Sequence, residues 1–271
     1  MGECEISGGY GIRPYCFVFA AVILVLLGLG LLLFSAARSN SNNTITLAAA
    51  GDILLDRGVR VQLEQHGYEY SYAWVKDILH KADIAFANLE SPLAAGGTAV
   101  FKDRTLLFRG DLENAAALKD AGFTILSLAN NHTMDYGSEG LSSTLDVLGS
   151  SSILSLGGGV NAEEARQPVY ITSNGGVIGF LGYSVFPPEG YVSFPHREEI
   201  ARVNIEFLPE EIAKAKRSCD FLVLSFHWGR EYDFFPSEQQ GEEILLRLQK
   251  FSQGFGTSIL IREGKGHLEK G

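Results

Sequence analysis

The sequence predicts an α/β domain of layered helices with a mixed sheet. Over residues 45–148, short apolar runs alternate with segments of helical spacing, which is typical of parallel strands joined by helices. Farther along, two apolar runs flank Ser173-Asn174-Gly175-Gly176, and this turn favours a β-hairpin because Asn and Gly tolerate positive φ. A hairpin added to parallel strands makes the sheet mixed.

Apolar runs bounded by glycine or polar residues predict the strands, at 45–50, 84–87, 123–128, 169–172, 177–181 and 221–226. Helical spacing predicts the helices, at 70–81, 112–121, 139–148, 209–216 and 237–251. In the first helix, one face carries Tyr72, Val75, Ile78 and Leu79. The second is expected to begin at Asp111 as N-cap and to end at Gly122.

An apolar segment at 17–34 contains no charged side chain and, as a helix, would span roughly 27 Å, close to a bilayer core. The sequence therefore predicts a cytoplasmic stub and membrane anchor at 1–38 and a polar tether at 39–44. The folded domain is expected at 45–251 and an atypical tail at 252–271. The alternative for the apolar segment is a signal peptide cleaved after Ser35-Ala36-Ala37, which would give a secreted protein.

Charge and cysteine content exclude several function classes. The 271 residues include 22 basic and 32 acidic side chains, a net charge of −10, and the basic residues form no cluster, so nucleic acid is not an expected partner. The 3 cysteines have no zinc-site spacing, and Cys219 is expected to be a small buried apolar residue.

Polar residues gather where four of the predicted strands end. Taken singly, each has a structural interpretation, such as a turn or a helix cap. Ligands and reacting groups of α/β proteins lie at the carboxyl ends of strands, so the four sets are expected to form one site. They are Asp52; Asn88 with Glu90; Asn130, Asn131 and His132, followed by Asp135; and His227.

This combination suits metal-dependent phosphoester hydrolysis. Carboxylates hold and bridge cations, and imidazole nitrogens or amide oxygens complete the ligand set. A further imidazole that binds no metal can assist the oxygen on which charge develops.

The chain resembles the capsule-synthesis CapA family, also called the poly-γ-glutamate synthesis accessory family. The resemblance covers about residues 45–240. The residues that carry it are Gly51-Asp52-Ile53-Leu54-Leu55, Asn88-Leu89-Glu90, Asn130-Asn131-His132 with Asp135 and Gly137, Gly157-Gly158-Gly159 with Asn161, Glu164-Ala165 and Pro168, the segment Phe180-Leu181-Gly182-Tyr183, and His227-Trp228-Gly229.

The resemblance implies a calcineurin-like metallophosphoesterase fold with layers in the order α-β-β-α, and up to two divalent ions (Mn, Fe, Zn or Mg). It implies that Asp52 binds the first ion, that Glu90 bridges, and that Asn131 and His227 bind the second. His132 would be the catalytic imidazole facing the phosphoryl oxygen. Asp135 would orient His132 or cap the next helix, and Asn88 and Asn130 would support the site.

The resemblance also implies a single-pass membrane protein with its domain outside the cytoplasm. Its expected function is capsule or poly-γ-glutamate biosynthesis, with polymer synthase subunits as partners and an extracellular polymer or lipid-linked phosphate as substrate. The alternative is a non-catalytic scaffold of the synthase complex.

Two departures from the family pattern favour weakened metal binding. Leu54 stands where related phosphoesterases carry a histidine, a departure that the family shares. The later Gly-His-x-Pro-His motif is also missing, since the chain offers only Gly266-His267-Leu268-Glu269. We therefore expect the tail at 252–271 to reflect a truncated or frameshifted reading frame.

Overall fold

The computed structural model describes residues 44–193 and 197–228, together with the backbone of 257–263. Thr44–Gly271 forms one compact unit. The predicted anchor at 17–34 and the predicted helix at 237–251 lie outside the described residues. Within the described part of the chain, no helix combines the length and the apolar character needed to cross a bilayer. The domain limits at 38, 44 and 251 stay predictions.

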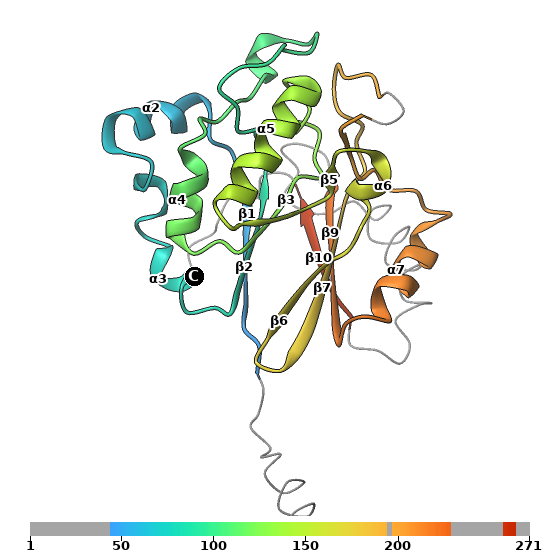
Figure 1. The fold of residues 1–271 in the computed structure, drawn as a ribbon. Coiled ribbons are helices and arrows are strands. Elements are labelled where there is room, and N and C mark those ends of the chain that lie inside the picture. The colour runs from blue at the N-terminus through green and yellow to red at the C-terminus, as the bar shows by residue number, and fades with distance from the viewer. Residues whose placement is uncertain (1–43, 194–196, 229–256, 264–271) are drawn as a thin grey trace, which may run out of the picture. The chain divides into compact units, whose positions relative to one another are not determined.

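Two four-stranded sheets form the centre of this unit (Figure 1). The first is parallel throughout and has the strands β1 (Leu47–Ile53), β2 (Ile84–Leu89), β3 (Ile125–Ser127) and β4 (Leu154–Leu156), in that order. The second has the order β10 (Thr257–Glu263), β9 (Phe221–Trp228), β7 (Gly176–Ser184) and β6 (Val169–Ser173). Because β6 alone runs antiparallel there, the prediction of a mixed sheet is confirmed.

A short antiparallel pair joins β5 (Gly158–Gly159) to β8 (Glu199–Ile200). The helices are α2 (Arg57–His66), α3 (Lys76–Leu79), α4 (Asn114–Ala121), α5 (Gly137–Ser150), α6 (Ala162–Ala165) and α7 (Leu208–Lys216), with 3₁₀ turns η1 (Tyr70–Tyr72) and η2 (Arg104–Leu106).

Three apolar clusters define the layers. One packs α2 to α5 against the first sheet, and another packs α6 and α7 against the second. Figure 1 shows α2, α3 and α4 on one side of the sheets and α7 on the other. The third cluster lies between the sheets, where the rings of Phe86 and Phe180 stack with centroids 6.1 Å apart. The layers therefore follow the predicted order α-β-β-α.

The β6–β7 hairpin confirms the turn prediction. Asn174 and Gly175 have φ values of 45° and 81°, as a two-residue turn of this kind requires. The Asn174 side chain also donates to the Asp83 carboxylate at 2.9 Å, so this turn contacts the amino end of the first sheet.

The single helix predicted at 70–81 is wrong. The structure has η1 and α3 there, with Tyr72 and Leu79 buried and Val75 and Ile78 exposed. Helices this short depend on packing, and only one side of the segment meets the core. Helix α2, capped by the Asp56 side chain, was not predicted at all.

Two finer predictions also fail. Asp111 is not an N-cap, because α4 begins at Asn114 and the Asp111 carboxylate accepts from Arg60 and, at 3.4 Å, from Tyr68 Oη. Cys219 is only half-buried, although it packs against the α6–α7 cluster and burial raises the pKa of its thiol.

Candidate metal centre

The carboxyl ends of strands from both sheets meet at the candidate site. In the first sheet, Asp52 on β1 is the neighbour of Asn88 on β2, which in turn is the neighbour of Ser127 on β3. The register of β1 shifts between Ala49 and Asp52, an irregularity of the kind that redirects a side chain next to a functional site. In the second sheet, β9 carries His227 at its end.

Asp52, Glu90 and His227 converge, as the sequence predicted. One ligand atom from each lies within 4.8 Å of the others. The His227 ring lies between the two carboxylates, with Nδ1 3.9 Å from Asp52 Oδ1 and Nε2 3.8 Å from Glu90 Oε1. Glu90 is buried, and Asp52 and His227 are partly buried.

The chemistry of this donor set fits a divalent cation. Two carboxylates brought together inside a protein repel each other, and a cation between them removes that cost. Since metal–ligand bonds of this type are about 2.0–2.2 Å long, small side-chain movements would bring the three donors onto one ion. Carboxylate and imidazole ligands suit Zn²⁺, Mn²⁺ and Fe²⁺ and do not select among them.

Asn88 and Asn130 hold this arrangement in place. Asn88 Nδ2 donates to Asp52 Oδ1 at 2.7 Å and lies 3.4 Å from His227 Nδ1. Asn130 is fully buried, and its Nδ2 donates to Asn88 Oδ1 at 3.1 Å and to Leu89 O at 2.8 Å. Its Oδ1 accepts from the backbone N–H groups of His132 and Thr133 at 3.0 and 2.9 Å. Both residues therefore contact the group formed by Asp52 and its neighbours, and their supporting role stays a prediction.

Asn131 lies beside His227, with 3.0 Å between Asn131 Oδ1 and His227 Nε2. The two residues expected to share a second ion are thus adjacent. His227 also belongs to the group with Asp52 and Glu90, the one group of three such ligands among the described side chains. Binding of a second ion stays a prediction.

His132 is buried against Phe108, with ring centroids 4.2 Å apart. Its Nδ1 lies 3.2 Å from Asp135 Oδ2, which also accepts from the Phe108 N–H at 2.8 Å. Of the two roles considered for Asp135, contact with His132 is the observed one. Helix α5 begins after Tyr136 without a side-chain cap.

Sequence reasoning missed two charged residues, one beside His132 and one beside Asn131. Lys102 Nζ lies 3.2 Å from His132 Nδ1 and forms an ion pair with Asp135. Glu189 Oε1 accepts from Asn131 Nδ2 at 3.4 Å, and Glu189 Oε2 lies 3.6 Å from Lys102 Nζ. Both residues belong to loops without a recognisable motif, so only the fold reveals them.

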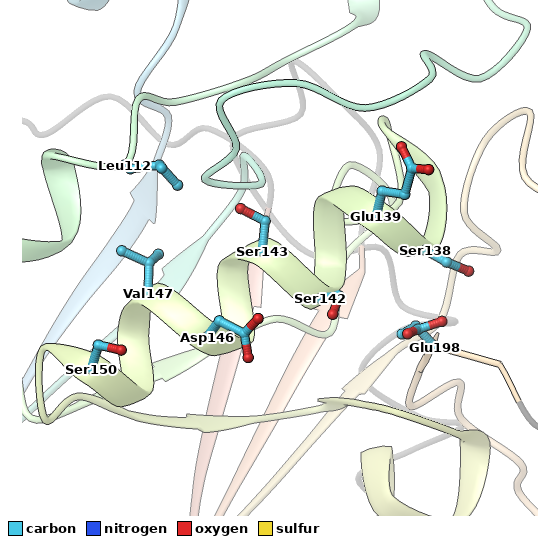
Figure 2. A pocket seen from close by; sticks show the side chains of 9 residues that line it. All are labelled: Leu112, Ser138, Glu139, Ser142, Ser143, Asp146, Val147, Ser150 and Glu198. Atoms are coloured by element: carbon cyan, nitrogen blue, oxygen red, sulfur yellow. The ribbon is translucent and has the colours of Figure 1, made fainter.

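An open groove of about 660 Å³ runs along α5 (Figure 2). Figure 2 shows its side chains spread along the helix, with Leu112 and Glu198 coming from neighbouring segments. They are Leu112, Ser138, Glu139, Ser142, Ser143, Asp146, Val147, Ser150 and Glu198. None is a predicted site residue, so the convergence of ligands, and not the presence of a groove, locates the site.

The sequence matches the family described as "Bacterial capsule synthesis protein PGA_cap" over residues 46–244. The chain belongs to the PGA_cap family. This match includes all of the predicted site residues, from Asp52 to His227.

Two PGA_cap relatives carry related names. The chain is 28% identical over 218 residues to "PGA biosynthesis protein CapA" of Bacillus subtilis (strain 168), covering 80% of this chain and 56% of that protein. It is 30% identical over 202 residues to "Capsule biosynthesis protein CapA" of Bacillus anthracis, covering 72% and 49%. The chain thus spans about half the length of these relatives.

Similarity to solved structures is weaker. A hypothetical protein from Thermus thermophilus gives a TM-score of 0.44 at 15% identity, covering 80% of this chain and 67% of that one. The calcineurin-like phosphoesterase YfkN from Bacillus subtilis gives a TM-score of 0.43 at 14% identity, covering 80% and 71%.

Proposed function

We propose that this PGA_cap protein acts in the synthesis of a capsule or poly-glutamate polymer as a metal-dependent phosphoesterase. Family membership and the names of the two CapA relatives support the polymer role. The observation that carries the enzymatic role is the convergence of Asp52, Glu90 and His227 beside Asn131, which directly precedes His132 in the sequence. The substrate class is a phosphoester of a lipid-linked or cell-surface intermediate, and polymer synthase subunits are the proposed partners.

In this proposal, Asp52, Glu90 and His227 hold a divalent ion, with Asn131 as a further oxygen ligand. The ion, when bound, supplies Lewis-acid polarisation of a phosphoryl oxygen. Asn88 fixes the Asp52 carboxylate through its 2.7 Å hydrogen bond. Asp135 contacts Nδ1 of His132, which leaves Nε2 as the ring nitrogen that would carry a proton to the departing oxygen.

Comparing two kinds of variant tests this proposal. The full-length chain, purified in detergent with Mn²⁺, is assayed with an aryl phosphate, and its metal content is measured. We expect His132→Ala to lower kcat about 100-fold or more with metal content unchanged, because it removes only proton transfer. Asp52→Asn and Glu90→Gln should lower both activity and metal content.

His66→Ala is the matched control, because His66 is an exposed histidine at the end of α2 and is none of the candidate site residues. Equal activity in the wild type and His132→Ala would contradict the catalytic role. A wild-type chain that binds no metal and hydrolyses no phosphoester would favour the scaffold instead.

The proposed location is the cell membrane, with residues 17–34 as the anchor and the domain outside the cytoplasm. Alkaline carbonate washing of isolated membranes tests the anchor, since an integral protein stays in the pellet. Release into the supernatant with a mature chain that begins after Ala37 would favour secretion.

A further inference from the structure

Lys102 is a nearly buried cation beside the candidate site. Its side chain is 7% exposed, and it pairs with the fully buried Asp135 while touching His132 Nδ1 at 3.2 Å. The segment that carries it is fixed by the Val100 N–H, which donates to Asp135 O at 2.9 Å. Burying an ammonium group is costly even when it is paired, so an ion pair of this kind is weak evidence for a purely stabilising role.

The second contact of Lys102 differs from the first. Glu189 reaches in from the segment after β7, and its side chain is 46% exposed. Its two carboxylate oxygens lie 3.4 Å from Asn131 Nδ2 and 3.6 Å from Lys102 Nζ, which is at or beyond the limit of a good hydrogen bond. Lys102 is therefore held closely by Asp135 and loosely by Glu189, and the Glu189 carboxylate can exchange with another anion.

Lys102 Nζ and Asn131 Nδ2 are two donors that face the two oxygens of the Glu189 carboxylate. An ammonium and an amide that share a carboxylate offer the same donors to a phosphoryl group, whose oxygens accept charge-assisted hydrogen bonds. Asn131 adjoins the candidate metal centre, because its Oδ1 contacts His227. Lys102 is linked to Asn131 through the Glu189 carboxylate, and it contacts His132, the next residue in the sequence.

We propose that Lys102 and the Asn131 amide form a subsite for a phosphoryl group of the substrate, and that the Glu189 carboxylate occupies this subsite until substrate displaces it. The proposal rests on the proposed phosphoesterase function and deepens it. Lys102 becomes a substrate-binding residue, and Glu189 becomes an internal competitor for the same donors.

Inorganic phosphate is the probe, and its Kd for the full-length chain is measured by titration calorimetry after EDTA treatment and again with Mn²⁺. Lys102→Met should raise this Kd about tenfold or more, because a charge-assisted bond is lost. Lys102→Arg should stay within about threefold, since the charge is kept. Glu189→Gln should lower Kd about three- to tenfold, because the competing anion is gone.

Lys81→Met and Glu69→Gln are matched controls for loss of charge at exposed positions outside the subsite, and both should leave Kd unchanged. A Kd that is unaffected by Lys102→Met, or not lowered by Glu189→Gln, overturns the proposal, as does a wild type that binds no phosphate in either state. If Lys102→Met does not fold, the Glu189→Gln result decides, since that residue is half-exposed.

Measuring the phosphate Kd of the EDTA-treated chain tests the subsite separately from the proposed metal-dependent hydrolysis. Failure of metal binding alone would leave a phosphate Kd that still depends on Lys102 and Glu189. Failure of the subsite alone would leave metal content and Mn²⁺-dependent activity intact while Lys102→Met bound phosphate like the wild type.

Discussion

The two sheets contribute to the candidate site in different ways. The first supplies Asp52, Asn88 and, just beyond its strands, Asn130, which form a chain of hydrogen bonds of 2.7 and 3.1 Å between neighbouring strand ends. The second supplies His227, which lies 3.0 Å from Asn131 Oδ1 and 3.4 to 3.9 Å from Asn88, Asp52 and Glu90. One part of the site is thus fixed within a single sheet, whereas the other depends on how the two sheets pack.

The largest expected effect comes from loosening that packing. Phe180→Ala removes a fully buried ring that stacks on Phe86 between the sheets, and it should lower the free energy of unfolding by about 3–5 kcal/mol. It should also weaken Mn²⁺ binding, because β7 pairs directly with β9, which carries His227. Urea unfolding and metal titration measure the two effects.

Phe123→Ala is the matched control for Phe180→Ala. Phe123 is equally buried but packs in the cluster between the helices and the first sheet, where its ring meets Tyr72. It should cost a comparable free energy of unfolding with little change in metal affinity. If both variants weakened metal binding equally, packing between the sheets would not be what positions His227.

An intermediate effect is expected inside the first sheet. Asn130→Ala leaves Leu89 O and the N–H groups of His132 and Thr133 without their present partner, which should cost about 2–3 kcal/mol of unfolding free energy. Asn130→Asp keeps the acceptor but buries a carboxylate against Asn88 Oδ1 and Leu89 O, so it should cost at least as much as Asn130→Ala. A smaller loss for Asn130→Asp than for Asn130→Ala, measured by urea unfolding, would contradict this expectation.

The smallest expected effect on stability is at the amino end of the first sheet, where Asp83 precedes β2. Hydrogen bonds from the Thr46 N–H and hydroxyl lower the pKa of Asp83 below its usual 3.8, and Asn174 of the β6–β7 turn adds another. A lowered pKa means that this contribution to stability is fully present above pH 3.8 and is lost as the pH falls through the lowered value.

Asp83→Asn should therefore unfold at lower urea concentration than the wild type at pH 6, and this difference should shrink at pH 3. Asp77→Asn, which changes an exposed carboxylate of α3, is the control and should show no such change. If the difference in unfolding between Asp83→Asn and the wild type stayed constant from pH 6 to pH 3, the charge of Asp83 would not be what stabilises its contacts with Thr46 and Asn174.

Local sequence signals predicted most of the fold and the residues that converge at the candidate site. The hairpin at Asn174-Gly175, the glycine that ends α4 and the apolar runs of β1, β2, β3 and β9 each carry their structure in a few adjacent residues. The candidate site residues were also predictable from local sequence, because each lies at the end of an apolar run. That they converge could be inferred from the parallel arrangement of the strands.

The errors fall where tertiary contacts override local preference. The segment 70–81 has helical spacing, but its packing against the core leaves only the short helices η1 and α3. The Asp111 carboxylate accepts from Arg60 and does not cap α4. Strand β10 was also not predicted, because its short apolar run at 259–261 lies in the segment 252–271, which was interpreted as an atypical tail. Lys102 and Glu189 belong to the same category, since nothing near either residue indicates its contacts with Asn131 and His132.

The order of the candidate ligands along the chain has a kinetic consequence. His227 is separated by 139 residues from Asn88 and by 96 from Asn131, whereas Asn88 and Asp52 are 36 apart. Contacts of large sequence separation form late, because closing a long loop costs entropy before the contact repays it. The carboxylates and amides can therefore assemble while β9 is still unfolded, and the imidazole joins them last. Acquisition of metal affinity during refolding would then report the completion of the domain.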